Sequence, residues 1–248
     1  MLHIESVISL HKRIFKNPWF THKTTKMTIV ISLILCVTAS YMNFQARHIN
    51  WEAWNQNKEQ FFVGDIPLFT TIDAGFFLGI ASYFKSGKTV EEYQKLRIFP
   101  LNQKNTENPK LSEQSVPLLS QIIAYLASDT SPKSLLLAAN KMIPYTAVIT
   151  VIAIFIAFAV TGYWLEASVA AAGGGLSIAY YWRSSIGRID TDQLNLGFLY
   201  FMFAMVLCAS KSKNMVYGLF FTTVAGLTAN FFVSWYGKSE LIIMAAFS

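Results

Sequence analysis

The residues best suited to chemistry lie in one segment, 180–194, which reads YYWRSSIGRIDTDQL. It contains two carboxylates, Asp190 and Asp192, and two guanidinium groups, Arg183 and Arg188, in a chain with only 14 acidic residues. In an extended segment, side chains two residues apart point to the same side, so both carboxylates would reach one divalent cation. On a helix the two side chains would diverge by about 200°. An extended loop at this position therefore favours metal binding.

The same acids also fit a purely structural role. Asp190, Thr191 and Asp192 stand directly before an apolar stretch, where acidic residues cap free N–H groups and suit the positive end of a helix dipole. Arg183 lies beside Trp182, and such a pair is typical of an anchor at a membrane interface. The spacing alone leaves both interpretations open.

The elements that position this segment belong to a chain that is too apolar for a water-soluble protein. Its 248 residues are 53% hydrophobic and 14% charged, against about 25% charged in soluble domains, and its mean hydropathy is +0.38. Nucleic-acid binders, secreted disulfide scaffolds and disordered chains are excluded. The net charge of +6 comes largely from the N-terminus, where it indicates orientation in a membrane. Cys36 and Cys208 lie inside apolar runs and predict neither a disulfide nor a metal site.

Five apolar stretches are candidates for membrane-spanning helices, which need about 20 largely apolar residues. The expected fold class is therefore an all-α integral membrane protein with about five transmembrane helices. The third stretch is rich in Ala and Gly, so we expect it to pack closely against its neighbours. The predicted spans are 27–44, 143–165, 167–182, 194–209 and 215–236.

Basic residues ahead of the first span place the N-terminal segment, 1–26, in the cytoplasm. Alternation of the spans then leaves two segments, 45–142 and 183–193, on the opposite side, and the chain closes with a tail, 237–248. The isolated acid Asp73 of the longer segment thus faces the same compartment as the acids of the shorter one. The basic residues are Lys12, Arg13, Lys16, Lys23 and Lys26.

The first apolar stretch has an alternative interpretation as a secretory signal, because a basic region precedes it. Its length is nearer to that of a span than to the shorter core of a signal. We therefore expect an integral protein of the inner membrane in a bacterium, or of the endoplasmic reticulum in a eukaryote. In both cases the acidic loops lie on the non-cytoplasmic side.

The long external segment is expected to be mixed in structure. Residues 73–84 predict a short amphipathic helix with Asp73 as its N-cap. Residues 85–113 are polar and predict a linker. Residues 116–127 are apolar but too short to cross, so they predict an interfacial or re-entrant stretch.

Three features favour a metal site over helix capping. Arg183 precedes Asp190 by seven residues, Gly187 permits a tight loop between them, and Asp73 is a second acid on the same side of the membrane. Together they carry a resemblance to a known family.

The pattern R-S-x-x-G-x-x-D-T-D-x-L, from Arg183 to Leu194, resembles the second external-loop signature of the oligosaccharyltransferase catalytic subunit. This family consists of integral-membrane C-type glycosyltransferases of protein N-glycosylation. The segment TIDAGFF, from Thr71 to Phe77, is similar to the family's first external-loop motif, an acid followed by small and aromatic residues. The resemblance covers most of the chain, from about Thr28 to Tyr236, and its second-loop motif is the more specific.

The resemblance implies an activity and a set of site residues. The family transfers a glycan from a lipid-pyrophosphate-linked oligosaccharide to the asparagine of an Asn-x-Ser/Thr sequon in an acceptor protein, using Mg or Mn. By this match, Asp73 and Asp190 are catalytic metal ligands and Asp192 is a supporting ligand. Arg183 pairs with the pyrophosphate or orients the acids. Hard carboxylate oxygens suit Mg or Mn, and the metal offsets charge on the departing pyrophosphate.

The chain departs from the family in three respects. Arg188 and Ile189 stand where the family often has aromatic residues. The family has many more spans, and it has a soluble external domain whose Trp-Trp-Asp motif grips the sequon. We therefore expect an N-terminal portion that does not transfer glycans alone: a fragment, one half of a split enzyme whose second chain supplies the rest, or a decayed paralogue kept for binding.

Two other functions compete with this interpretation. One is a different C-type glycosyltransferase, moving for example mannose or aminoarabinose from a lipid carrier, but the D-x-D with its upstream Arg and Gly favours the oligosaccharyltransferase. The other is a non-catalytic membrane protein such as a small transporter. No ionisable residue lies deep within a predicted span, which argues against an ion path.

Overall fold

The computed structural model describes residues 25–88, 116–237 and 239–247, and about four fifths of these residues are helical. Four helices in these ranges are long and apolar enough to cross a membrane, which indicates an all-α membrane protein, as the composition predicted. The predicted basic segment 1–26 and linker 85–113 lie mostly outside the described residues. The four helices are α2 (Lys26–Gln56), α8 (Pro132–Ala159), α11 (Asp192–Lys211) and α12 (Met215–Trp235).

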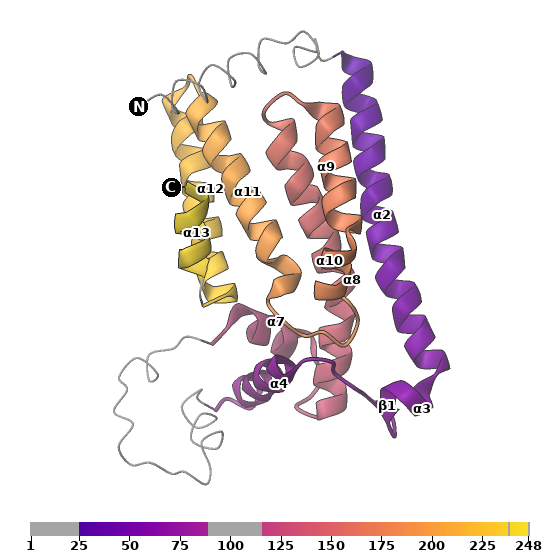
Figure 1. The fold of residues 1–248 in the computed structure, drawn as a ribbon. Coiled ribbons are helices and arrows are strands. Elements are labelled where there is room, and N and C mark those ends of the chain that lie inside the picture. The colour runs from indigo at the N-terminus through magenta and orange to yellow at the C-terminus, as the bar shows by residue number, and fades with distance from the viewer. Residues whose placement is uncertain (1–24, 89–115, 238, 248) are drawn as a thin grey trace, which may run out of the picture.

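Helix α8 forms the centre of the bundle. In its most apolar stretch 67% of the residues are buried, against 22% in α2 and 17% in α12. Figure 1 shows α2 on one side of the molecule and α11 and α12 on the other, and both α2 and α11 pack against α8. The apolar side chains that α2 and α12 leave exposed are therefore the surface that a bilayer would cover.

The third predicted span, 167–182, is not one continuous helix. It consists of α9 (Trp164–Leu176) and α10 (Ile178–Arg183), which follow one another along the bundle (Figure 1). Ser177 interrupts them with a ψ of 140°, and its hydroxyl accepts a hydrogen bond from the Tyr180 N–H, which begins α10. Neither helix alone reaches the length of a span, so four helices meet that criterion where the sequence indicated about five.

The close packing expected of the Gly-rich stretch is present in α9. A Cβ at Gly175 would lie 2.4 Å from Val151 Cγ2 on α8 and 2.8 Å from Asn43 Nδ2 on α2. Both distances are far shorter than a van der Waals contact, so only glycine lets α9 approach the two helices together.

Two helices extend well beyond the apolar runs that predicted them. The first predicted span ended at Phe44, but α2 continues to Gln56 and includes Arg47. The second began at Ile143, but α8 starts at Pro132, where Ser131 is the N-cap. Hydropathy marks where lipid is tolerated, whereas a helix continues as long as its backbone hydrogen bonds and packing continue.

The segment between α2 and α8 contains short elements that pack on the protein. The helix predicted at 73–84 is α4 (Ile72–Lys85), but its N-cap is Thr71, and Asp73 lies in its first turn. The apolar stretch 116–127 forms α7 (Leu118–Leu126), which packs on α4 and α8 and buries Leu119 and Ile123 completely, whereas Leu126 stays exposed. The remaining elements are α3 (Lys58–Phe61), the hairpin of β1 (Phe62–Val63) and β2 (Ile66–Pro67), and α13 (Ser239–Phe247), which packs on α12.

The connections separate into two ends of the bundle (Figure 1). At one end the α8–α9 turn meets the end of α11, where Lys211 Nζ donates to the Val160 carbonyl at 2.9 Å. The loop 184–191 lies at the other end, together with α4 and α7. The backbone N–H of Thr70, just before α4, donates to the Gly187 carbonyl at 2.9 Å. The two acidic segments that the sequence placed on one side thus lie at one end of the molecule.

Candidate functional site

The loop 184–191 turns sharply at Gly187, which has a φ of +79°. Few residues other than glycine adopt this left-handed conformation without strain. The Gly187 N–H donates to Asn140 Oδ1 of α8 at 2.7 Å, while its carbonyl accepts from Thr70. A Cβ at this position would lie 2.3 Å from Trp54 Cη2 of α2. The loop is thus held in a narrow space between α2, α8 and the segment before α4.

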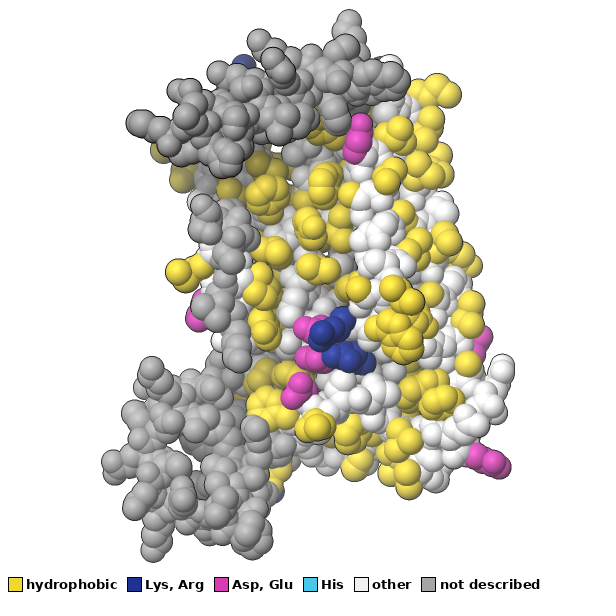
Figure 2. All heavy atoms as spheres, viewed as in Figure 1, with side chains coloured by type: hydrophobic (Ala, Val, Ile, Leu, Met, Phe, Trp, Pro, Cys, Tyr) yellow, Lys and Arg dark blue, Asp and Glu magenta, His cyan; other side chains and the backbone are white. Residues whose placement is uncertain are grey.

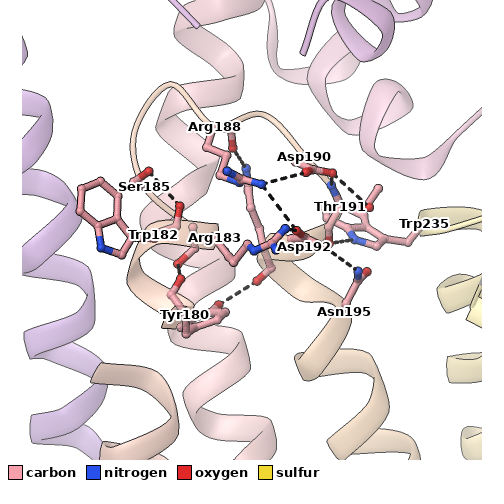
Figure 3. A network of polar contacts seen from close by, with 12 residues as sticks. Tyr180, Trp182, Arg183, Ser185, Arg188, Asp190, Thr191, Asp192, Asn195 and Trp235 are labelled. Carbon is pink, nitrogen blue, oxygen red and sulfur yellow. Dashed lines mark hydrogen bonds and ion pairs between the residues drawn. The ribbon is translucent and has the colours of Figure 1, made fainter. Parts of the chain in front are cut away.

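The second half of the loop is fixed by α11 and α12. Gln193 Nε2 donates to the Arg188 carbonyl at 2.5 Å, and the buried indole of Trp235 donates from Nε1 to the Thr191 carbonyl at 2.7 Å. Figure 3 shows the Trp235 ring directed at this carbonyl. Asp190 lies between these two anchored carbonyls and Asp192 directly follows the second, so the loop holds both acids in set positions, which a binding site requires.

Four charged side chains meet in this loop (Figure 3). Arg183 Nη1 lies 2.6 Å from Asp192 Oδ2. Arg188 Nη2 lies 3.7 Å from Asp190 Oδ2 and 3.8 Å from Asp192 Oδ2, so one cationic nitrogen faces both carboxylates. Figure 2 shows the charges gathered on a face that is otherwise largely hydrophobic or uncharged. The two acids therefore face one cationic nitrogen, but not from the extended segment that the sequence indicated, because Thr191 is in the helical region of backbone space and Asp192 is already the first residue of α11.

Asp190 is the more enclosed of the two acids, with 15% of its side chain exposed. Burial raises the pKa of its carboxyl above the ordinary value, and the carboxylates of Asp192 and Asp73 raise this pKa further. The Thr191 N–H, which donates to Asp190 Oδ1 at 2.6 Å, and the Arg188 guanidinium oppose these effects. The ionised form of Asp190, which the two neighbouring carboxylates destabilise, is stabilised by a cation that binds between these acids.

Neither acid caps α11 through its side chain. The N-cap is Thr191, which makes no side-chain capping bond, and Asp190 accepts only from Thr191 among the described hydrogen bonds. Asp192 lies in the first turn, where it suits the helix dipole, but its oxygens face Arg183 and Asn195. The capping alternative thus accounts for the position of Asp192 in the helix but not for the partners of either carboxylate.

Asn195 belongs to the site and was not singled out from the sequence. Its Nδ2 lies 3.4 Å from Asp192 Oδ1, and its own Oδ1 is buried without a hydrogen-bond partner among the described residues. Arg188 Nε is buried without a partner in the same sense. The sequence signal for Asn195 was its position three residues after Asp192, because residues three apart on a helix share a face. Orphaned polar atoms beside the acids leave hydrogen-bonding capacity for a ligand.

Asp73 lies near the pair but is not brought into a shared ligand set. It sits exposed in the first turn of α4, close enough to raise the pKa of Asp190. Within the described residues, no group of three or more His, Cys, Asp or Glu side chains is close enough to hold a metal ion. Asp190 and Asp192 offer two hard oxygen donors that face one position, now occupied by Arg188 Nη2, and this is fewer than the roughly six oxygens that a hard divalent cation takes. A third ligand has to come from Asp73 after a local movement, from water or from a substrate.

An apolar cavity of about 480 Å³ begins directly beside the charged loop. It lies between α8, α11 and α12, and its lining includes Leu194 and Phe198, in the first two turns of α11 after Asp192. Phe198 packs against Trp235, which anchors the loop. Lining residues such as Leu227 remain 55% exposed, so the cavity is open toward the surface that a bilayer would cover.

No protein-family model matches the chain, and a search of curated proteins finds no match. Any assignment of function therefore rests on the residues of the site and on the motif resemblance that they carry.

Proposed function

We propose that this chain carries the donor-binding part of an oligosaccharyltransferase, which transfers a glycan from a lipid-pyrophosphate carrier to the asparagine of an Asn-x-Ser/Thr sequon. One observation carries the proposal. Two carboxylates and two arginines meet at the start of α11, and the next turn of the same helix, with Leu194, Gly197 and Phe198, lines an apolar cavity in the helix bundle. A lipid pyrophosphate needs this combination, since it joins a strongly anionic group to a long hydrocarbon chain. The R-S-x-x-G-x-x-D-T-D-x-L motif supports the same assignment.

The polar residues suit the pyrophosphate. Asp190 and Asp192 would hold Mg or Mn, and the bound cation would offset charge on the departing pyrophosphate. Arg183 is 61% exposed and, among the residues that the structure describes, pairs with Asp192 through one nitrogen, so its guanidinium can turn to a phosphate and bind it bidentately. Asp73, in the first turn of α4, would contact the acceptor amide or complete the ligand set.

The apolar cavity suits the carrier's hydrocarbon chain. Its lining from α8, α11 and α12 is apolar except for Thr228, whose hydroxyl already donates to the Val224 carbonyl, so a hydrocarbon chain inside it buries apolar surface without covering an unpaired hydroxyl. The lining of the cavity begins at Leu194, two residues beyond Asp192. A lipid carrier whose hydrocarbon chain fills the cavity would therefore have its pyrophosphate beside the acids. In this arrangement the loop end of the bundle faces the non-cytoplasmic side of a bacterial inner membrane or of the endoplasmic reticulum, and a second chain supplies the sequon-binding domain.

The test is a binding experiment followed by a transfer assay, both with the full chain in nanodiscs. Binding of a radiolabelled polyprenyl-pyrophosphate glycan is measured with and without Mn2+, and a fluorescent Asn-x-Thr peptide then reports transfer. The proposal expects Mn2+-dependent binding of the lipid pyrophosphate. Equal binding of the corresponding polyprenol, or no binding at all, would contradict it. Mn2+-dependent binding together with transfer to a sugar acceptor instead of the peptide would favour a different C-type glycosyltransferase.

Filling the cavity should weaken binding of the lipid but not of its headgroup. Leu227→Trp places a larger ring in the lining, and we expect about tenfold weaker binding of the polyprenyl-pyrophosphate glycan, since roughly 1.4 kcal/mol corresponds to a few buried methylenes. Inorganic pyrophosphate should bind unchanged. Leu219→Trp is the matched control, because Leu219 lies on the same helix, is 58% exposed and does not line the cavity. Equal losses of affinity for the lipid in both variants would rule out the cavity as the binding site of the hydrocarbon chain.

Removing the built-in cation should strengthen metal binding. Arg188→Gln takes away the guanidinium that faces both carboxylates, and we expect Mn2+ affinity to rise about tenfold, because a positive charge within about 4 Å opposes a divalent cation. Electron paramagnetic resonance of free Mn2+ gives the affinity directly. Lys58→Gln, at the same end of the bundle, is the control and should change nothing (Figure 1). A fall in affinity on Arg188→Gln would mean that the arginine helps to hold the ligand.

A further inference from the structure

A fully buried arginine lies on α2 beside the start of the acidic loop. Arg47 has 0% exposure, and it makes no ion pair with any carboxylate in the part of the chain that the structure describes. A buried charge is costly unless it is hydrogen-bonded, and a buried guanidinium without a counter-ion is therefore rare. Its place in α2, a helix long and apolar enough to cross a membrane, makes the cost larger still.

The guanidinium is satisfied by polar groups and aromatic rings. Nη1 donates to Asn43 Oδ1 at 2.8 Å and to the Asn43 carbonyl at 3.2 Å, one helical turn earlier on α2. Nη2 donates to Ser184 Oγ at 2.6 Å, and Nε donates to the Ser184 carbonyl at 3.3 Å. The faces of Tyr180 and Tyr181 lie 5.5 and 5.1 Å from the guanidinium carbon. The planar guanidinium thus links α2 to the end of α10 through several hydrogen bonds at once, which the single ammonium group of a lysine would not achieve.

The residue that Arg47 holds is the first of the acidic loop. Ser184 is the C-cap of α10, and its carbonyl has no intrahelical partner beyond the helix end. A cation at the carboxyl end of a helix also suits the dipole. Arg183, the last residue of α10, precedes Ser184 directly and reaches Asp192 at 2.6 Å. A shift of Ser184 would therefore move Arg183 away from the acids.

We propose that Arg47 is a positioning residue, which clamps the end of α10 to α2 and thereby fixes the acidic loop and the direction of Arg183. Its hold on the loop follows from the contacts alone. Its consequence for metal and pyrophosphate binding rests on the proposed function. The two parts need separate readouts.

The loop is tested by the distance between two spin labels. Labels at Ser185, in the loop, and at Tyr125, 88% exposed at the end of α7, are introduced after Cys36→Ala and Cys208→Ala remove the two free thiols. The proposal expects one narrow distance distribution in the starting protein and a broad or displaced one in Arg47→Met. Arg47→Lys should not restore the narrow distribution, because an ammonium group cannot span Asn43 and Ser184 together.

Asn50→Ala is the matched control for general loosening of α2. Asn50 lies one turn after Arg47 and donates from Nδ2 to the Tyr181 hydroxyl at 2.8 Å, so it links the same helices without touching the loop. It should leave the distance distribution narrow. An unchanged distribution in Arg47→Met, or equal broadening in Asn50→Ala, would overturn the proposal.

Two further measurements keep the test decisive. If Arg47→Met does not fold, Ser184→Ala removes the hydroxyl that accepts the 2.6 Å bond from Arg47 and that donates to the Tyr180 carbonyl, and it should broaden the distribution in the same way; no broadening there would overturn the proposal. Where the starting protein binds Mn2+, Arg47→Met and Arg47→Lys should weaken this binding about tenfold or more, as loss of a supporting contact does, and Asn50→Ala should not. Absence of Mn2+ binding in the starting protein counts against the proposed function, and the label distances alone then decide the role of Arg47.

Discussion

Asp190→Asn should reduce the affinity of the chain for Mn2+ by more than about 100-fold, since it removes a direct ligand rather than a supporting group. The amide keeps an oxygen that can accept from the Thr191 N–H, so the loop retains its shape. It loses the negative charge that a hard divalent cation requires. Mn2+-dependent binding of a lipid pyrophosphate should disappear together with Mn2+ binding, as measured by paramagnetic resonance and by retention of the labelled lipid.

The same substitution should leave the protein as stable as before or more stable at neutral pH. Burial and the neighbouring carboxylates raise the pKa of Asp190, so the ionised side chain disfavours the folded state once the pH exceeds that raised pKa. The asparagine has no such charge. Its advantage in melting temperature should therefore grow as the pH rises through the raised pKa, and it should vanish below the ordinary aspartate pKa of about 3.9. A loss of function with a gain of stability is typical of a binding site.

Asp65→Asn is the control for both measurements. Asp65 is an acid on the β1–β2 turn, 70% exposed and paired with Lys133, which lowers its pKa. Asp65→Asn should leave Mn2+ affinity unchanged. It should not raise stability at neutral pH, because the pKa of Asp65 is lowered and its ionised form therefore favours the folded state. Equal Mn2+ affinity in Asp190→Asn and the starting protein would remove the metal site from this loop.

The sequence predicted the apolar helices and the charged loop because both depend on local patterns. Long apolar runs marked α2, α8, α11 and α12, and the density of charge between Arg183 and Asp192 singled out the loop at which the ion pairs form. Gly187 indicated the turn that its positive φ confirms. In each case neighbouring residues carry enough information, since hydropathy and loop geometry need no knowledge of distant contacts.

The features that the sequence did not predict depend on contacts between distant segments. Arg47 stands beyond the first apolar run and was assigned to the external segment, because nothing local shows that Ser184 comes to meet it. The break at Ser177 lies inside an apolar stretch whose hydropathy does not change there. The cavity between three helices requires their packing to be known. Local sequence patterns predict the helices, whereas contacts between distant segments determine which polar groups find hydrogen-bond partners.

Gly187→Ala should lower the free energy of unfolding by about 3 kcal/mol. A non-glycine residue in the left-handed region costs about 1 kcal/mol, and forcing an extra methyl into a packed site costs about 1 to 3 kcal/mol more. The methyl would lie 2.3 Å from Trp54 Cη2 and 3.2 Å from Thr70 Cγ2. Trp54 is buried and stacked on Phe61, with ring centroids 4.7 Å apart, so its ring has little room to move. Unfolding by denaturing detergent measures the change.

The steric and backbone parts of this loss can be separated. Gly64→Ala introduces the same methyl at a φ of +63° with no atom within 4 Å, so it should show only the backbone cost of about 1 kcal/mol. Trp54→Phe removes the ring atoms that the methyl would meet, so the double variant with Gly187→Ala should lose less stability than the sum of the two single variants. Strict additivity, or equal losses at Gly64 and Gly187, would mean that the loop moves freely. The acids would then lack the fixed geometry from which their shared cation was inferred.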